Sequence, residues 1–124
     1  MIKEEIPTVQ ISTPIYPRIK GIGAYPINQA VSLFSVVGDI SAPVRNDYTL
    51  PMEEIGQNYG YLLYRTKIEK ASSAAALKVV DGGDRIQWYL DQKPVATQYQ
   101  DQLAKSIVIE VPKPTSELSL LVEN

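Results

Sequence analysis

Carboxylates are the residues that could carry catalysis in this chain, because it contains no histidine and no cysteine. Glycoside hydrolysis can run on two carboxylates alone. Glu53 and Glu54 are adjacent, however, so their side chains point in different directions, and we interpret them as charges at a helix start. Asp81 and Asp84 lack the further oxygen ligands of a calcium loop, so they indicate a turn. We therefore expect no catalytic residue, no metal site and no cofactor.

Aromatic side chains are the remaining candidates for binding, since sugars stack on such rings. The segment 85–91 alternates apolar and polar residues, and this alternation puts Trp88 on the apolar face, where it packs in the core. Tyr89 falls on the opposite face. We interpret Tyr89 and Tyr99 as the better candidates for exposed rings that contact a sugar. The alternative, that both are ordinary exposed tyrosines without a ligand, stays open.

Arg65 has the most unusual position in the chain, within a stretch that is otherwise apolar and aromatic. A planar guanidinium among tyrosines can be anchored by a carboxylate or by backbone carbonyls. We therefore expect a structural role for Arg65 first, and a role in ligand binding second.

Composition narrows the class of protein. Of 124 residues, 44% are hydrophobic and 21% are charged, which is typical of one folded domain. The formal net charge is −2 with the two signs interspersed, so there is no basic stripe for nucleic acid. No apolar run is long enough to cross a membrane, and the charged start of the chain does not resemble a signal peptide. We expect no nucleic-acid or membrane partner and a cytoplasmic location.

The elements that must position these residues are short strands. Apolar and polar residues alternate after residue 58, and turn residues recur at roughly ten-residue spacing, which is typical of an antiparallel sandwich or barrel. The first strand has apolar residues on both sides, so we expect both of its faces to be largely covered. The pattern predicts strands at 59–68, 74–80, 85–91, 95–100, 106–111 and 118–123.

Proline divides the chain into two regions. Most of its nine prolines fall in the first 51 residues, where they interrupt regular structure. We therefore predict an extended Pro-rich lead-in over 1–50, packing on a sandwich core over 51–124. Within the lead-in, the apolar stretch 29–37 predicts a strand or a short helix that stops at Gly38. The segment 51–55 predicts one helical turn closed by Gly56.

The segment 51–66, PMEEIGQNYGYLLYRT, closely resembles the region that follows the catalytic barrel in β-galactosidases of glycoside hydrolase family 35. Further landmarks of that family are similar in the same order at 31–34, 43–45, 84–86 and 120–124. We single out as structural motif residues Tyr59, Gly60, Tyr61, Tyr64, Arg65, Thr66, Asp84, Arg85, Glu123 and Asn124, which carry the resemblance, and Trp88, which rests on its place on the apolar face.

The resemblance implies an all-β fold, an antiparallel β-sandwich of the galactose-binding-like, jelly-roll type. It also implies that this is the first non-catalytic domain after the barrel, so that no catalytic glutamate lies in this chain. Such a domain would support the barrel and shape the rim of its sugar pocket, in an enzyme that hydrolyses terminal β-galactosyl bonds. Its partners would be the barrel and the other β-domains. The alternatives are a free-standing carbohydrate-binding module and a ligand-free interaction domain.

The resemblance breaks off at Glu123 and Asn124, where the family pattern continues. We therefore expect a sandwich that is truncated at its C-terminal end. Its incomplete sheet edge would favour self-association, with 118–122 or its sheet neighbour at the contact.

Overall fold

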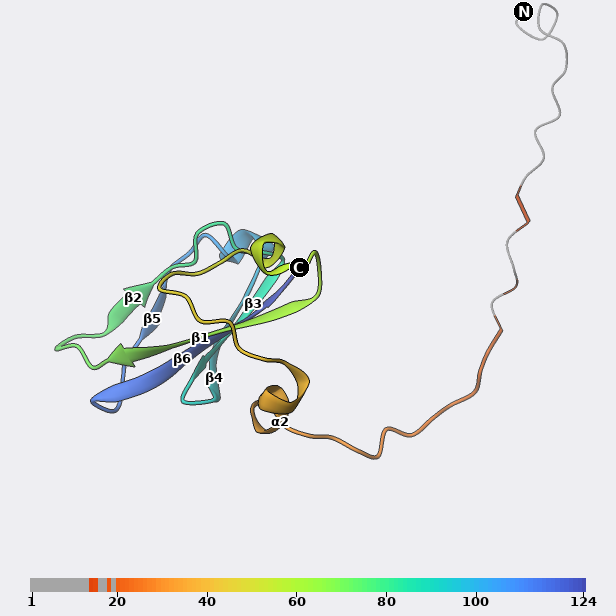
Figure 1. Ribbon diagram of the computed structural model, residues 1–124, viewed down its shortest axis with the longest axis horizontal. Coiled ribbons are helices and arrows are strands. Elements are labelled where there is room, and N and C mark those ends of the chain that lie inside the picture. Colours follow the sequence, from red (N-terminus) through yellow and green to blue (C-terminus); the bar gives the residue numbers. More distant parts are fainter. Residues whose placement is uncertain (1–13, 16–17, 19) are drawn as a thin grey trace, which may run out of the picture. The chain divides into compact units, whose positions relative to one another are not determined.

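A computed structural model describes residues 14, 15, 18 and 20–124 of the chain (Figure 1). The chain divides into two units, Met1–Val31 and Ser32–Asn124. The described residues of the first unit form no helix or strand, and all of them are exposed. The second unit holds every helix and strand of the described residues, so it is the part that positions the candidate residues.

The regular elements of the second unit are mostly strands, as the alternation of apolar residues predicts. They are the helix α2 (Leu33–Ile40), the 3-10 turns η1 (Met52–Ile55) and η2 (Gln100–Gln102), and the strands β1 (Tyr61–Glu69), β2 (Ala75–Leu77), β3 (Arg85–Leu90), β4 (Lys93–Tyr99), β5 (Ile107–Ile109) and β6 (Thr115–Glu123). The expectation of an all-β antiparallel sandwich is confirmed.

The strands form two antiparallel sheets. The larger has four strands in the order β1-β6-β3-β4, and the smaller pairs β2 with β5 (Figure 1). Strand β6 therefore lies in the middle of the larger sheet, with Leu120 opposite Tyr64 of β1 on one side and opposite Trp88 of β3 on the other. The expected contact was 118–122 or its sheet neighbour. Both sides of β6 are hydrogen-bonded, whereas the other edge of its neighbour β1 pairs with no strand of the described residues.

The core lies on one face of the larger sheet, which we call the inner face. Ile86, Trp88 and Leu90 of β3 are 0%, 2% and 8% exposed, as their spacing of two residues predicts. They pack with Leu118 and Val122 of β6 and with residues from the smaller sheet and the connecting turns. The apolar alternation of β3 and β6 thus determines which face of the sheet is buried.

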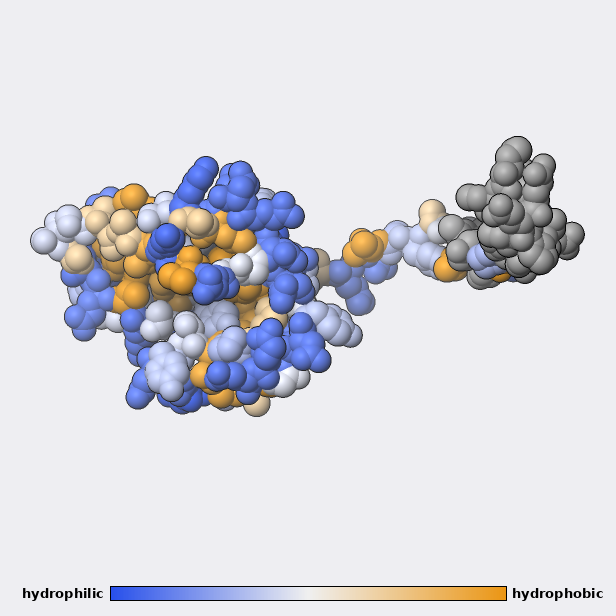
Figure 2. Space-filling view, turned by 90° about the horizontal axis from the view of Figure 1, so that it is seen from above, coloured by the Kyte–Doolittle hydropathy of each residue, from blue (hydrophilic) through white to orange (hydrophobic). Residues whose placement is uncertain are grey.

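Strand β1 is less covered than its sequence predicts. None of its nine residues is buried; 62–64 and Ile68 are half-buried, and the other five are exposed. The expectation that both faces would be largely covered is wrong, because β1 is an edge strand and has a neighbour on one side only. Figure 2 shows hydrophobic residues reaching the surface of the second unit between hydrophilic ones.

The two short segments before β1 are helical. The apolar stretch at 29–37 forms α2, but the helix runs through Gly38 and ends at Ile40. A glycine lacks a side chain, yet it does not by itself break a helix. The turn η1 forms as expected, and Gly56 closes it with φ +78°, a left-handed conformation that glycine adopts without a steric cost.

The hairpin between β3 and β4 is tighter than expected. Its two turn residues are Asp91 and Gln92, with φ of +48° and +67°, and Leu90 pairs directly with Lys93. Two positive φ values in succession indicate a type I′ turn. Pro94 therefore lies within the edge strand β4, where a missing N–H group is tolerated.

Candidate functional site

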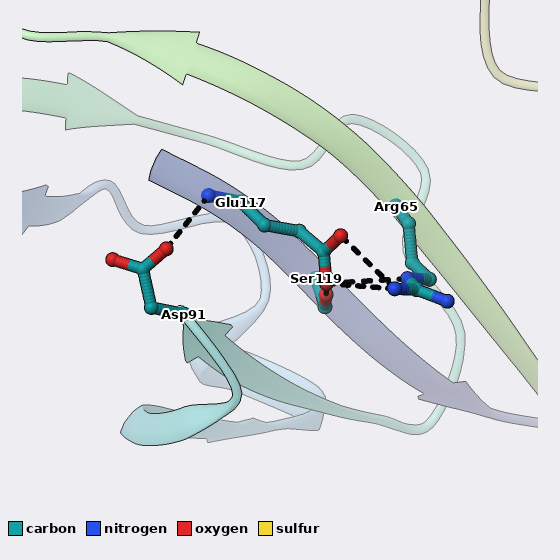
Figure 3. Close-up of polar contacts among 4 residues, drawn as sticks. All are labelled: Arg65, Asp91, Glu117 and Ser119. Carbon is teal, nitrogen blue, oxygen red and sulfur yellow. Dashed lines mark hydrogen bonds and ion pairs between the residues drawn. The ribbon is translucent and has the colours of Figure 1, made fainter. Parts of the chain in front are cut away.

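The outer face of the larger sheet carries a cluster of charged side chains around Glu117 (Figure 3). The guanidinium of Arg65, on β1, reaches diagonally to β6 and donates to both carboxylate oxygens of Glu117, with Nη2 3.0 Å from each. Ser119 of β6, which is fully buried, donates through its hydroxyl to the same carboxylate at 3.5 Å. Arg65 does meet a carboxylate, but its partner is only partly buried, since the two side chains are 41% and 29% exposed.

Asp91 ties the end of β3 to the same region of β6. Its carboxylate accepts a hydrogen bond from the backbone N–H of Glu117 at 3.0 Å, and its own N–H donates to the Glu117 carbonyl at 2.8 Å. The Nζ of Lys113 lies 3.5 Å from the carboxylate. The hydrogen bond from the Glu117 backbone N–H is the largest cause that holds the pKa of Asp91 below its usual range, and the positive charge of Lys113 acts in the same direction.

This cluster has a structural role. Arg65 occupies both oxygens of Glu117, and Asp91 is held ionised by hydrogen bonds that favour its charged form. A general acid needs a raised pKa, whereas the pKa of Asp91 is lowered. A general base needs a free lone pair, whereas both carboxylate oxygens of Glu117 accept hydrogen bonds from Arg65. The cluster therefore fixes β1, β6 and the end of β3 relative to one another.

A second polar contact lies inside the core. The indole N–H of Trp88 donates to the side-chain oxygen of Gln98 at 2.9 Å, and the Gln98 amide group donates to the carbonyls of Gln102 and Lys105, each at 2.9 Å. Gln98 is only 4% exposed. The sequence marks Trp88 as a core residue but gives no sign of Gln98, because glutamine on a strand usually faces solvent.

The two tyrosines proposed from the sequence have different environments. Tyr89 is half-buried, and its ring meets the ring of Phe34 from α2 edge-on, with centroids 4.9 Å apart. The expectation of an exposed Tyr89 platform is therefore wrong, because a helix more than fifty residues earlier in the chain partly covers it. Tyr99, by contrast, is 52% exposed.

Arg85 joins Tyr99 to the centre of the sheet. Its Nε donates to the Tyr99 hydroxyl at 3.3 Å, and its Cζ lies 5.6 Å from the centre of the Tyr99 ring. On the other side, Nη1 is 3.8 Å from the Glu123 carboxylate. The Tyr99 hydroxyl, ahead of Glu123 and Tyr61, raises the already high pKa of Arg85, so this guanidinium stays charged.

Several motif residues meet at this end of the sheet. Gly60 and Asn124 exchange two backbone hydrogen bonds of 2.9 and 3.0 Å, and Glu123 lies between Tyr61 and Arg85 in the register of the strands. The backbone N–H of Gln100 donates a hydrogen bond to the backbone carbonyl of Asp84. Three separate landmarks of the sequence, 59–61, 84–85 and 123–124, thus form one region.

The other motif residues lie further along β1. Tyr64 is on the inner face and donates through its hydroxyl to the Leu50 carbonyl at 2.6 Å. Burial, followed by the charge of Glu53, raises the pKa of Tyr64. Thr66 is exposed. Tyr64 therefore attaches the segment before η1 to the sheet.

An open hollow on the sandwich is lined by neither candidate tyrosine. Its volume is about 310 Å³, and it is lined by Lys78–Gly82, Gln100, Leu103 and Ala104. In the described part of the chain, no group of acidic side chains could hold a metal ion, and no helix is long and apolar enough to span a bilayer.

Comparison with known proteins agrees with this all-β architecture. Residues 49–124 match the family described as the first all-beta domain of β-galactosidase. A β-galactosidase of Xanthomonas manihotis is 35% identical over 101 residues, which is 82% of this chain but 16% of that protein. Because the matched stretch is longer than the span 49–124, this likeness extends into residues before 49. The chain belongs to the family of first all-β domains of β-galactosidases.

Proposed function

We propose that this chain is a non-catalytic β-sandwich domain of a glycoside hydrolase family 35 β-galactosidase, with the connectivity of a galactose-binding-like jelly roll. In the whole enzyme, which hydrolyses terminal β-galactosyl bonds, it supports the catalytic barrel and the rim of the sugar pocket. The observation that carries the proposal is the family match over 49–124. The partners are the barrel and the other β-domains of the same polypeptide.

The contacts of the sandwich favour a supporting role. Arg65 and Asp91 hold three strands together through Glu117, and Gln98 fixes the turn after β4 from within the core. Fixed polar contacts of this kind make a surface rigid, and a rigid surface is what a neighbouring domain needs in order to keep a loop of its pocket in place.

A domain exchange tests the supporting role. The 101-residue stretch of the Xanthomonas manihotis enzyme that matches this chain is replaced by the corresponding residues of this chain, and in a second protein it is deleted. We expect the exchanged enzyme to hydrolyse a chromogenic β-galactoside, and we expect the deletion to lower both activity and melting temperature. A deleted enzyme that keeps both would overturn the proposal.

The isolated chain provides the complementary test. We expect no hydrolysis of the same substrate, because the carboxylates of the Glu117 cluster are occupied by Arg65 and by backbone N–H groups. Turnover that persists through purification and is abolished by Glu117→Gln would show that the domain is itself catalytic.

Self-association is a second candidate property, favoured by the free edge of β1. Gly60 bonds to Asn124 and Lys70 bonds to the Pro114 carbonyl, so the even-numbered residues between them point their backbone groups at β6. The odd-numbered residues from Leu63 to Glu69 direct theirs outward. We propose that two copies pair weakly along this edge.

A further inference from the structure

One end of the outer sheet face carries two exposed aromatic rings on a single line across the strands. In the register of the sheet, Tyr61 of β1 is opposite Glu123 of β6, Glu123 is opposite Arg85 of β3, and Arg85 is opposite Tyr99 of β4. Tyr61 and Tyr99 are 58% and 52% exposed. We call these four residues the tyrosine row. Its ends are separated by three strand spacings, about 14 Å.

The middle of the tyrosine row is held in place from both sides. Arg85 bonds to the Tyr99 hydroxyl and to the side-chain oxygen of Gln87, and it lies 3.8 Å from Glu123. Gln87 is itself fixed by its bond to the Ala96 carbonyl at 3.0 Å. The guanidinium and the carboxylate are half-exposed, at 30% and 40%, so both keep sites for further hydrogen bonds.

Helix α2 contacts the outer face away from the tyrosine row. Phe34 contacts Tyr89, two positions further along the outer face of β3 than Gln87. In the described residues no other ring contacts Tyr61 or Tyr99, and Tyr99 stays 52% exposed although Arg85 lies over its ring at 5.6 Å. The tyrosine row is thus the part of the outer face where aromatic rings remain accessible.

We propose that the tyrosine row binds a neutral oligosaccharide of several linked pyranose rings, laid across the strands. The apolar face of a pyranose stacks on a tyrosine ring, and two such rings at the ends of the row hold two sugar units of one chain. Between them, the hydroxyl groups of the middle units accept hydrogen bonds from Arg85 and donate to Glu123.

The charge of the row selects the class of ligand. Arg85 and Glu123 cancel, so the row attracts neither a phosphate nor a cationic peptide strongly, and a neutral polyhydroxylated chain fits best. Tyrosine and arginine are common at protein interfaces while glutamate is depleted there, so a protein partner is the competing outcome that the test below separates from sugar binding. The inference goes beyond the supporting role proposed above and does not depend on it.

The test is a titration of the 124-residue chain with β-1,4-linked galactotetraose and with cellotetraose, followed by NMR and calorimetry. We expect saturable binding of at least one of the two at millimolar concentration, with shifted signals confined to β1, β3, β4 and β6 near the row. We expect free galactose to bind far more weakly, since it spans one ring only.

Four variants make the test specific. Tyr61→Ala and Tyr99→Ala should each weaken binding about threefold to tenfold, the factor of one aromatic contact. Tyr48→Ala removes a tyrosine that is 74% exposed and lies outside the row, so it should bind like the unaltered chain. Tyr99→Phe keeps the ring and should retain most of the affinity, which separates loss of stacking from loss of fold.

Three results would overturn the inference. One is the absence of saturable binding to either tetrasaccharide by a chain whose NMR spectrum shows it folded. Another is binding that survives the double change of Tyr61 and Tyr99 to alanine. If the row instead responds to an added protein, such as the β-galactosidase of Xanthomonas manihotis lacking the matching stretch, it is a docking surface and the sugar proposal fails.

Discussion

The Trp88 side chain stabilises the core directly and, through its hydrogen bond to Gln98, the turn after β4. The indole fills space between the two sheets, and its N–H satisfies the oxygen of a buried amide whose own N–H groups fix the residues after β4. Because a buried acceptor without a partner costs free energy, the hydrogen bond and the packing contribute separately to the free energy of unfolding.

Substitutions at Trp88 separate these two contributions. We expect Trp88→Ala to lower the free energy of unfolding by about 3–5 kcal/mol, the usual loss for an emptied aromatic site. Trp88→Phe keeps most of the ring but leaves the Gln98 oxygen unpaired, so it should cost about 1–3 kcal/mol. Tyr89→Ala is the control, since Tyr89 is only half-buried and should cost less than Trp88→Ala. Urea denaturation measures all three, and a larger loss for Tyr89 would contradict the assignment of the faces.

The Arg65–Glu117 pair should contribute modestly to the free energy of unfolding. It has bidentate geometry, but both side chains are partly exposed, and water screens such pairs. We expect Arg65→Ala to cost about 1 kcal/mol. Arg65→Lys should restore only part of it, because an ammonium cannot make the planar double contact. Thermal unfolding at low and high salt checks this, and a loss that does not shrink in salt would indicate a role other than the ion pair.

Asp91 should make the stability depend on pH on the acid side. Its pKa is lower in the folded chain than in the unfolded chain, so its stabilising effect is complete above the unfolded value of about 4 and is lost as the pH falls through the lowered folded value. Asp91→Asn keeps the left-handed turn residue, because asparagine adopts positive φ readily. The two melting temperatures should therefore differ at pH 7 and converge at low pH. A constant difference would mean that the charge of Asp91 is not involved.

At the scale of elements, the β3–β4 turn departs from what its residues favour. A type I′ turn favours Asn-Gly or Asp-Gly, and here Gln92 takes the position with φ +67° that glycine fits best. The sequence shows a turn near residue 92 but not its type, because the type depends on the register of the two strands. That register is set by the buried pairs of β3 and β4 rather than by the turn itself.

Gln92→Gly should stabilise the hairpin. Positive φ costs a residue other than glycine roughly 1–2 kcal/mol, and this gain exceeds the entropy that glycine adds to the unfolded chain. We expect the free energy of unfolding to rise by about 0.5–1 kcal/mol. Lys93→Gly is the matched control, because Lys93 has no positive φ and should only lose stability. Denaturant midpoints of the two variants should therefore move in opposite directions.

At the scale of the whole molecule, the sequence predicts strands and faces but not neighbours. Alternation alone places Ile86, Trp88 and Leu90 in the core, because period two is a local property of a strand. Which strands pair depends on contacts between distant segments. For that reason the central position of β6, the exposed edge of β1 and the contact of Phe34 with Tyr89 could not be predicted. The Arg65–Glu117 partnership also joins residues 52 apart and follows from the register.

The free edge of β1 leads to a prediction about association. Leu63, Arg65, Lys67 and Glu69 direct their backbone groups away from β6, whereas the Tyr61 carbonyl is already covered by the Gln57 amide at 2.7 Å. Pairing of two copies along Leu63–Glu69 would satisfy these groups. The positive charges of Arg65 and Lys67 oppose close pairing, as charged side chains commonly do on edge strands. We therefore expect a weak dimer that forms only at high concentration and is strengthened by salt.

Proline can test this edge without breaking the sheet. Lys67→Pro removes an N–H group that points outward, so the fold should persist while dimers disappear in sedimentation and light scattering. Thr66→Pro is its counterpart on the inward-bonded position opposite Leu118, where the lost hydrogen bond should lower the melting temperature strongly. Lys67→Thr removes the charge but keeps the N–H group, and it should favour the dimer. If the chain stays monomeric at every concentration, or if the dimer survives Lys67→Pro, then β1 is not the surface along which copies meet.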